Sequence, residues 1–321
     1  MSADNVEVPV RMKALRAHER GGPEVVVFED APVPALRGDD EVLVRVGAAS
    51  ITFDELTWPE TWASGGVDRT PIIPSHEFAG VVVAVGSAVT GFVVGDRVFG
   101  LAPFDRDGAA AEYVAVPSFA LAHLSDGVTG ITAAAAVLPA LTAMEAVDEH
   151  LAIAEGQRLL VRGGAGGVGA FVVQFAARLG VQVMATSRSD SAVARLKELG
   201  ADAVLVGDEP ESIETASYDA AIDTVGAGTP EWLYRGVRAG GRLITLQEPP
   251  SDELAAKCGV DARFFVVRTD PAALTRLGEL LAAGDLEVAV AATFPLAEGR
   301  AAYESRGHAT APGKIVLLPS A

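Results

Sequence analysis

The segment from Arg158 to Asp190 constrains the fold more than any other part of the chain, because it spells a strand, a glycine-rich turn, a helix and a second strand. Residues 159–161 form a short apolar run that suits a strand buried on both faces. The chain then turns through Gly164, Gly166 and Gly169, which fit the spacing G-x-G-x-x-G. In such a loop the glycines allow a tight turn, a close approach to a pyrophosphate and close packing of the helix on the strand.

The residues that follow the glycine turn supply the context that such a motif requires. Apolar residues recur at helical spacing from Phe171 to Leu179, and Gly180 is a typical helix stop. Residues 182–186 then supply the second strand. A phosphate at the start of that helix would meet free N–H groups and a favourable dipole. The segment therefore predicts a dinucleotide site, in preference to the alternative of a purely structural glycine turn.

The end of the second strand indicates which dinucleotide is bound. An Asp or Glu at this point would bond the ribose 2′-hydroxyl of NAD, and no acid stands there. The chain continues instead through Ser187 and Arg188, whose hydroxyl and guanidinium suit a 2′-phosphate. The nearest acid, Asp190, is a candidate N-cap for the next helix. We therefore expect NADP(H), the alternative being that Arg188 is only a solvated surface residue.

Composition excludes several classes of protein. The chain has 321 residues, 50% of them hydrophobic, which is enough for more than one domain. Its net charge of −18 argues against nucleic-acid and anionic-membrane partners. The single cysteine, Cys258, excludes an intrachain disulfide framework and a multi-cysteine zinc site. The first residues lack an apolar signal region, and we expect no run of the roughly 18 apolar residues that span a membrane, hence a cytoplasmic protein.

The spacing of apolar runs changes near residue 130. Before it, short valine-rich runs separated by turn signals predict a β-rich, barrel-like domain, with strands at 25–28, 41–46, 78–85, 96–99 and 111–116. After it, apolar strands alternate with helical patterns, which indicates a parallel sheet covered on both faces, with strands at 159–161, 182–186, 203–206, 220–223 and 242–246. We then expect a strand at 264–267, a helix at 271–283, and strands at 288–294 and 314–318 that rejoin the first domain.

Short glycine-rich and polar motifs punctuate the chain from end to end. They are His76-Glu77-Phe78-Ala79-Gly80, Gly86, Gly91, Gly95-Asp96-Arg97-Val98, Ala140-Leu141-Thr142-Ala143, Ala165 to Gly169, Asp223-Thr224-Val225-Gly226, Gly240-Gly241-Arg242 and Gly313-Lys314-Ile315-Val316. In this order and spacing the chain resembles the zinc-independent members of the medium-chain dehydrogenase/reductase superfamily, in the quinone oxidoreductase branch.

The resemblance implies an α/β protein with two domains: a GroES-like β-barrel catalytic domain, and a Rossmann domain with a doubly wound parallel sheet inserted into it. The implied bounds are residues 1–127 for the first part of the catalytic domain, 128–262 for the NADP-binding Rossmann domain and 263–321 for the return to the catalytic domain. The active site is expected between the domains. The resemblance also implies a homodimer, with residues 264–267 as the candidate edge strand.

Carried over by position, the resemblance also assigns the cofactor contacts. The implied contacts are Gly164, Gly166, Gly167 and Val168 for the pyrophosphate, Ser187 and Arg188 for the 2′-phosphate, Thr142, Phe265 and Val266 for the nicotinamide, Val225 and Leu246 at strand ends beside the cofactor, and Lys314 near its phosphates or ribose. The alternatives are that Thr142 bonds its own helix backbone, that Val225 and Leu246 are core residues, and that Lys314 is solvated.

The chain departs from the zinc-dependent members of this superfamily, which hold zinc through two further side chains besides the histidine of the His-Glu pair. Residues 51–54 keep Asp54 but offer no thiolate, and Cys258 is far from either expected position. His76 alone cannot supply the three protein ligands of a catalytic zinc site, so we expect no metal. Asp54 and His76 are the candidate catalytic residues, the alternatives being that Asp54 caps a helix from Glu55 and that His76 is structural.

Residues 52–62 carry two of the three tryptophans and are expected to line the substrate pocket. Phe53, Trp58, Trp62 and the distant Phe265 would give flat walls for a planar substrate, unless the tryptophans pack a loop onto the barrel. Without zinc to stabilise an alkoxide, a conjugated acceptor is the easier substrate. We therefore expect NADPH-dependent hydride transfer to a small molecule, a quinone or an α,β-unsaturated carbonyl compound. A biosynthetic enoyl-thioester reductase and a non-catalytic NADPH-binding sensor are the alternatives.

Overall fold

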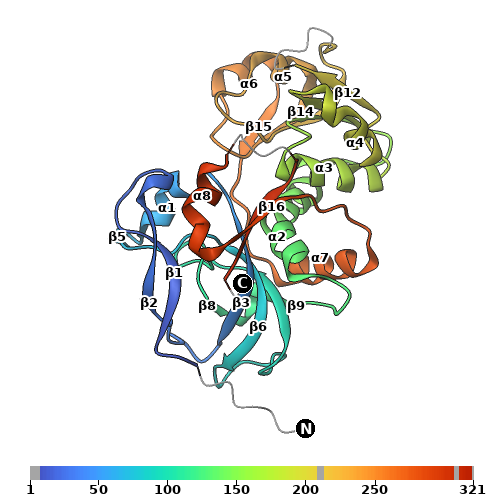
Figure 1. The fold of residues 1–321 in the computed structure, drawn as a ribbon. Helices are drawn as coiled ribbons and strands as arrows, with labels where there is room; N and C mark the ends of the chain where they lie inside the picture. The colour runs from blue at the N-terminus through green and yellow to red at the C-terminus, as the bar shows by residue number, and fades with distance from the viewer. Residues whose placement is uncertain (1–7, 208–212, 307–310, 320–321) are drawn as a thin grey trace. The chain divides into compact units, whose positions relative to one another are not determined.

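The computed structural model describes residues 8–207, 213–306 and 311–319. The chain divides into two compact units, residues 1–138 with 269–321, and residues 139–268. We call them the β-rich unit and the parallel-sheet unit, and Figure 1 shows the elements of each. The predicted domain boundaries at 127/128 and 262/263 stay predictions, because a compact structural unit need not coincide with a functional domain.

The parallel-sheet unit is built on six strands that all run in the same direction, in the order β12-β11-β10-β13-β14-β15. The strands are β10 (Arg158–Arg162), β11 (Gln182–Ser187), β12 (Ala203–Val206), β13 (Tyr218–Asp223), β14 (Val237–Thr245) and β15 (Asp261–Phe264). Its helices are α3 (Gly167–Arg178), α4 (Val193–Glu198), α5 (Glu231–Gly236) and α6 (Asp252–Cys258). This is the predicted doubly wound Rossmann sheet.

The strand order of this sheet reverses between β10 and β13, which are neighbours although α3, β11, α4 and β12 lie between them in sequence. In open sheets of this kind a ligand binds at the carboxyl ends of the strands at such a switch point. The glycine-rich loop leaves the carboxyl end of β10, and the turn after Asp223 leaves the carboxyl end of β13. The topology therefore brings these two loops together.

The β-rich unit contains a seven-stranded sheet, with the path β16-β17-β3-β6-β7-β9 and β8 paired to β3, and two strand pairs, β1-β2 and β4-β5. Its strands are β1 (Arg11–Ala17), β2 (Val26–Pro32), β3 (Glu41–Ile51), β4 (Ala63–Ser64), β5 (Val67–Asp68), β6 (Glu77–Val85), β7 (Arg97–Leu101), β8 (Tyr113–Pro117), β9 (Leu121–His123), β16 (Val290–Pro295) and β17 (Lys314–Leu318). Its helices are α1 (Pro59–Trp62), α7 (Pro271–Ala283) and α8 (Gly299–Glu304).

The helix α7 shows how local sequence signals set the bounds of an element. Asp270 caps its start by accepting from the N–H of Ala272, and Pro271 occupies the first turn, where its missing N–H costs nothing. Gly284 ends it with φ of 70°, the left-handed conformation that glycine adopts without strain. Leu274, Leu277 and Leu281 then form the buried face.

The register of the long strand β3 arranges the polar part of the β-rich unit. β3 pairs antiparallel with β17, which sets Ile51 opposite Ile315, and with β6, which sets Ser50 opposite Glu77. Thr52, just beyond the end of β3, thereby lies beside the first residues of both partner strands. Three chain segments far apart in sequence meet at this point.

Two predictions about element ends are wrong. The strand expected at 264–267 is β15, Asp261–Phe264, because its ladder with β14 runs from Arg242–Asp261 to Thr245–Phe264 and β14 ends there. Apolar residues continue past Phe264 without a partner strand. Asp190 is not the N-cap of α4, which begins after Ala192 without a side-chain cap. Asp190 lies instead in a 3-10 turn, Asp190–Ala192, that Ser189 caps by accepting from the N–H of Ser191.

One apolar helical stretch is longer than the sequence analysis expected. α2 (Gly130–Glu145) continues to Leu151 through a short π-helical end. Within these 22 residues an 18-residue window has a mean hydropathy of 1.6, enough by length and composition to cross a membrane. The window is 72% buried inside the protein, however. It has the burial of a core helix.

Core packing in the parallel-sheet unit is testable at Leu160, which is fully buried on β10 in a cluster with Tyr218, Leu233 and Leu243. We expect Leu160→Ala to lower the free energy of unfolding by about 2–5 kcal/mol through the cavity it leaves. The control is Leu179→Ala, at a side chain that is 41% exposed, which should change stability by less than about 0.5 kcal/mol. Urea denaturation measures both, and equal losses would contradict the packing described here.

Candidate functional site

The glycine-rich loop has a backbone that only glycine allows at its key points. Gly163 has φ of 82°, in the left-handed region. A Cβ on Gly169 would lie 2.2 Å from the carbonyl oxygen of Gly163, so the start of α3 packs directly against the turn. The N–H of Gly164 donates to the carbonyl of Thr186 at 3.0 Å, which ties the loop to the end of β11.

The loop opens into α3 at a helix N-terminus that has no side-chain cap. Gly166 is the N-cap residue, and Gly167, Val168 and Gly169 form the first turn. The N–H groups of a first turn have no acceptor within the helix, and the helix dipole adds positive potential there. This geometry, in a loop without side chains at 166 and 167, fits the pyrophosphate of a dinucleotide.

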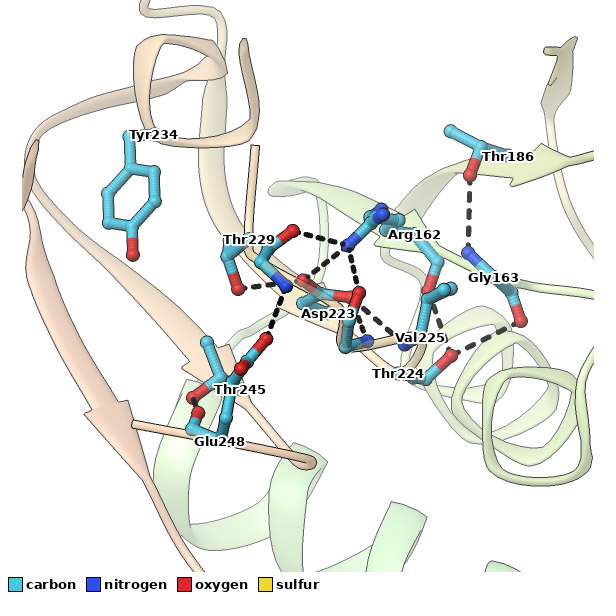
Figure 2. A network of polar contacts seen from close by, with 12 residues as sticks. Arg162, Gly163, Thr186, Asp223, Thr224, Val225, Thr229, Tyr234, Thr245 and Glu248 are labelled. Carbon is cyan, nitrogen blue, oxygen red and sulfur yellow. Dashed lines mark hydrogen bonds and ion pairs between the residues drawn. The ribbon is translucent and has the colours of Figure 1, made fainter. Parts of the chain in front are cut away.

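The switch point beside this loop is held by the buried carboxylate of Asp223, which is 1% exposed (Figure 2). Its Oδ2 accepts from Arg162 at 2.8 Å and from the hydroxyl of Thr229 at 2.8 Å. Its Oδ1 accepts from the backbone N–H of Val225 at 2.9 Å and of Gly226 at 3.4 Å. One carboxylate thus joins the end of β10 to both ends of the 223–229 turn.

The same network extends to the glycine loop through Thr224. Its hydroxyl donates to the carbonyl of Arg162 at 2.8 Å, and a contact of 3.3 Å reaches the carbonyl of Gly163 (Figure 2). The hydroxyl of Thr186, from the neighbouring strand, accepts from the N–H of Gly163 at 3.2 Å. Three strand ends therefore fix the conformation of the loop before any ligand arrives.

Apolar side chains stand exposed beside this polar network. Val225, two residues after the end of β13, is 48% exposed, and Val266, two residues after the end of β15, is 59% exposed. Leu246 follows the end of β14 and is half-buried. Exposed apolar groups at the carboxyl ends of parallel strands are suited to contact a flat ring. Val225 is therefore not a core residue, and Leu246 is only partly buried.

Ser187 and Arg188, the two residues expected to bind the 2′-phosphate, differ in their exposure and hydrogen bonds. Ser187 is buried, and its hydroxyl accepts from the N–H of Ser189 at 3.2 Å and donates to the Ser189 carbonyl at 3.1 Å. Arg188 is exposed, and no acidic residue in the described ranges pairs with it. The guanidinium at the end of β11 is therefore available to an anion.

In the β-rich unit, the register of β3 assembles a buried ion pair. Lys314 Nζ donates to Glu77 Oε1 at 2.6 Å and to the hydroxyl of Thr52 at 2.9 Å, and that hydroxyl donates to Glu77 Oε1 at 3.0 Å. Glu77 Oε2 accepts from the N–H of Leu138 at 3.3 Å. Burial raises the pKa of Glu77, although Lys314 and Thr52 favour its charged form.

A second buried carboxyl group, Glu55, lies in the same unit and is 1% exposed. Its Oε1 accepts from the hydroxyl of Tyr303, and its Oε2 accepts from the N–H of Ser75 at 2.8 Å. Burial raises the pKa of Glu55 to about 7, while those two donors and Lys314 act in the opposite direction. Lys314 therefore influences two buried carboxyl groups, and it forms its ion pair with Glu77 rather than with Glu55.

His76 lies between these two carboxyl groups in sequence and is 3% exposed. Its Nδ1 has no hydrogen-bond partner among the described residues. Burial lowers the pKa of His76 to about 4, so the imidazole is neutral near pH 7. Its ring meets Phe104 edge to face at 5.0 Å, and Phe104 meets Trp58 in the same way at 5.6 Å.

Comparison with known proteins gives concordant results. Residues 38–139 match the family described as alcohol dehydrogenase GroES-like domain, and residues 199–317 match the one described as zinc-binding dehydrogenase. The chain is 30% identical to the NADPH-dependent alkenal/one oxidoreductase of Arabidopsis thaliana, over 98% of this chain and 81% of that protein. It is also 30% identical to the quinone oxidoreductase of Pseudomonas aeruginosa, over 96% of this chain and 99% of that one.

The chain belongs to the medium-chain dehydrogenase/reductase superfamily. The solved structure of the quinone oxidoreductase from Coxiella burnetii superposes with a TM-score of 0.85 at 26% identity, covering 96% of this chain and 99% of that one. A mycobacterial protein solved in complex with NADPH gives a TM-score of 0.82 at 29% identity, covering 96% and 100%. The predicted fold, with its GroES-like and Rossmann parts, is confirmed, and the chain is an oxidoreductase.

Several residues that the superfamily resemblance assigns to the site make hydrogen bonds, ion pairs or ring contacts with other residues of the protein. Lys314 is not solvated, because it is paired with the buried Glu77. Trp62 is 2% exposed and its indole N–H donates to the carbonyl of Leu56 at 2.9 Å, so it packs the 52–62 segment into the core and offers no pocket wall. Phe265 lies against the ring of His150, with 4.1 Å between centroids.

The remaining implied positions are placed as follows. Asp54 does not cap the turn from Glu55 with its side chain, because its carboxylate pairs with Arg306. The Arg306 guanidinium also lies over the ring of Phe53, 5.8 Å from its centroid. Thr142 is 8% exposed within α2. Trp58 is half-buried, unlike Trp62.

Sequence reasoning missed Glu55, Tyr303 and Phe104. A glutamate next to a tryptophan-rich segment carries no local sign of burial, and its partner Tyr303 lies 248 residues away. Phe104 sits in a turn-rich stretch that resembles an ordinary surface loop. In the described part of the chain, no group of three or more His, Cys, Asp or Glu side chains could hold a metal ion.

The raised pKa of Glu55 makes a prediction about stability. The folded protein binds this proton more tightly than the unfolded chain, so the group favours folding at low pH. That contribution is lost as the pH rises from 4.5, the ordinary value, to about 7. Relative to the unsubstituted protein, Glu55→Gln should therefore gain on the order of 1–3 kcal/mol between pH 5 and pH 8.

Urea denaturation at a series of pH values measures this difference. Glu60→Gln is the matched control, because that glutamate lies on the same segment with an exposed side chain. A constant stability difference between the Glu55→Gln variant and the unsubstituted protein across this range would contradict the assignment.

Proposed function

We propose that the protein transfers hydride from NADPH to a quinone or an α,β-unsaturated carbonyl compound, without zinc. The observation that carries the proposal is a helix N-terminus without a side-chain cap together with Arg188, which directly follows the adjacent strand β11 and pairs with no acidic residue in the described ranges. A pyrophosphate fits the first group and a 2′-phosphate the second. Two relatives support the cofactor, one named NADPH-dependent and one solved in complex with NADPH.

Except for Lys314, which the resemblance puts near the cofactor phosphates or ribose, the proposed residues keep the roles that the resemblance gives them. Gly164, Gly166, Gly167 and Val168 surround the pyrophosphate, and Ser187 completes the ribose site mainly by shaping the turn that carries Arg188. Val225, Leu246, Val266 and Phe265 offer apolar contacts to the rings of the cofactor. Thr142 is proposed to contact the nicotinamide side. Lys314 is proposed to contribute through its ion pair with Glu77, which holds β17 against β6.

The acceptor class follows from the chemistry that the side chains can support. NADPH supplies a hydride, and the acceptor gains that hydride and one proton while NADPH becomes NADP⁺. Reduction of a simple ketone concentrates negative charge on one oxygen, which a metal commonly stabilises. A conjugated acceptor spreads that charge, and relatives named alkenal/one oxidoreductase and quinone oxidoreductase support this class. A homodimer through the exposed edge strand β15 and a cytoplasmic location stay predictions.

The cofactor assignment predicts a selective effect at Arg188. We expect Arg188→Ala to weaken NADPH binding by about 1.5–3 kcal/mol, the loss of a charged hydrogen bond, and to leave NADH binding nearly unchanged. Arg45→Ala, at an exposed arginine of β3, removes the same charge elsewhere and is the control. Fluorescence titration with both cofactors measures the four affinities. Equal losses for NADPH and NADH would remove Arg188 from the 2′-phosphate site.

The substrate class is tested by oxidation of NADPH at 340 nm with 1,4-benzoquinone, 9,10-phenanthrenequinone, 2-cyclohexenone, crotonyl-CoA and a simple ketone, with NADH in parallel. We expect turnover of the quinones or the enone, with NADPH preferred. Exclusive turnover of crotonyl-CoA would instead indicate an enoyl-thioester reductase. Binding of NADPH with no turnover of any acceptor would indicate a sensor and would refute the proposal.

A further inference from the structure

The segment after β15, residues 265–268, leaves the parallel sheet although it begins with three apolar residues. The ladder between β14 and β15 ends at the pair Thr245–Phe264, so the backbone beyond it has no partner strand to follow. Arg268 is the last residue of the parallel-sheet unit. Such a segment is conformationally free unless side chains fasten it, and ordering it costs free energy.

One carboxylate, that of Glu145 at the end of α2, fastens the far end of this segment. Its Oε2 accepts from the backbone N–H of Arg268 at 3.0 Å, and its Oε1 accepts from Nε of Arg268 at 3.2 Å. Glu149, four residues further along, accepts from the same guanidinium at 2.6 Å. The side chain of Glu145 is 10% exposed and that of Arg268 is 67% exposed. Because exposed ion pairs contribute little, the hydrogen bond from the backbone N–H to the nearly buried carboxylate is the contact that fixes the segment.

The near end of the segment is held by a ring contact on the same helical stretch. Phe265 lies against the imidazole of His150, with 4.1 Å between centroids. Nε2 of that imidazole lies 3.3 Å from Oε1 of Glu145, so the carboxylate also orients the ring on which Phe265 rests. The carbonyl of His150 accepts from Arg242 at 3.1 Å, which ties this end of the stretch to β14. The segment therefore has one contact point at each end, and Glu145 takes part in both.

Val266 lies between these two contact points and is 59% exposed. The next residue, Val267, is only 8% exposed, so the segment buries one valine and presents the other. An exposed apolar side chain on a backbone that is held at both ends is suited to pack on a flat ring. The cofactor assignment gives Val266 and Phe265 to the nicotinamide ring. The position of this apolar surface depends on Glu145.

We propose that Glu145 is a positioning residue for the nicotinamide half of the cofactor. The proposal rests on the proposed function and deepens it, because it names the side chain that presents Phe265 and Val266 to the ring. Glu145 itself touches neither the cofactor nor the acceptor. With the segment fixed in advance, NADPH binds without the cost of ordering it. The glycine-rich loop and Arg188 bind the phosphates, and that half of the site does not depend on Glu145.

The experiment separates the two halves of the cofactor. Isothermal titration calorimetry on the full chain measures the affinity for NADPH and for adenosine 2′,5′-bisphosphate, which carries the 2′-phosphate but no nicotinamide. We expect Glu145→Ala to weaken NADPH binding by about 10-fold, the scale of ordering one residue of backbone on binding, and to leave the affinity for the bisphosphate unchanged. Glu145→Gln keeps an oxygen that accepts from the N–H of Arg268 and should recover most of the loss.

Asp261→Asn is the matched control. It removes a carboxylate from an ion pair of 2.6 Å with Arg263, at the amino end of β15, and should change neither affinity. Equal losses for NADPH and the bisphosphate in Glu145→Ala, or no loss for NADPH, would overturn the proposal.

The fluorescence lifetime of bound NADPH follows the nicotinamide ring itself. At saturating NADPH the lifetime should be shorter in Glu145→Ala than in the unsubstituted protein, because the ring is held less rigidly, and it should stay the same in Asp261→Asn. An unchanged lifetime in Glu145→Ala would also overturn the proposal. Neither readout needs turnover, so binding of NADPH without turnover of any acceptor would refute the proposed function while these two measurements still decide the role of Glu145. Failure of the unsubstituted protein to bind NADPH would refute both.

Discussion

The buried carboxylate of Asp223 is the interaction on which the architecture of the parallel-sheet unit depends. Parallel strands deliver all their carboxyl ends to one edge, where loops must turn without a ladder to satisfy their backbone groups. Asp223 satisfies the N–H groups of Val225 and Gly226 and neutralises Arg162 from the adjacent strand. Removing either charge would leave the other buried and unpaired, which is strongly destabilising. The turn after β13 is therefore fixed by one side chain, and Thr224 and Thr186 connect the glycine-rich loop to the same strand ends.

In the β-rich unit the important electrostatic feature is a pair of buried carboxyl groups. Glu77 and Glu55 are both buried, and Lys314 is the cation among the described residues that lowers the pKa of each. The ammonium pairs with Glu77, so Glu55 is stabilised by the hydroxyl of Tyr303 and an N–H instead, and it holds its proton to a higher pH. This arrangement also fastens the 52–62 segment to α8 and to the strand β17, which lie more than 240 residues further along the chain.

The imidazole of His76, next to Glu77 in sequence, is buried and neutral near pH 7, and its Nδ1 has no hydrogen-bond partner among the described residues. Its neighbours hold the backbone through Ser75, and its cover consists of aromatic rings. Superfamily resemblance directs attention to His76 as a residual metal ligand, whereas the structure shows a buried, neutral imidazole against the ring of Phe104. The difference lies in tertiary contacts, because a histidine in sequence does not reveal which of its two nitrogens is satisfied.

The sequence by itself determined the Rossmann unit, since glycine spacing, strand patterns and helix caps act over a few residues and each encodes its own conformation. It also identified Arg188, because the absence of an acid at that point is visible in the chain. It misplaced β15 by three residues, because apolar residues continue past the point where the partner strand ends. Only the tertiary structure decided that Trp62 is core, that Lys314 serves Glu77 and that Glu55 is buried. Those outcomes depend on the register of β3 with two distant strands, and register is set by packing of the whole sheet rather than by any local signal.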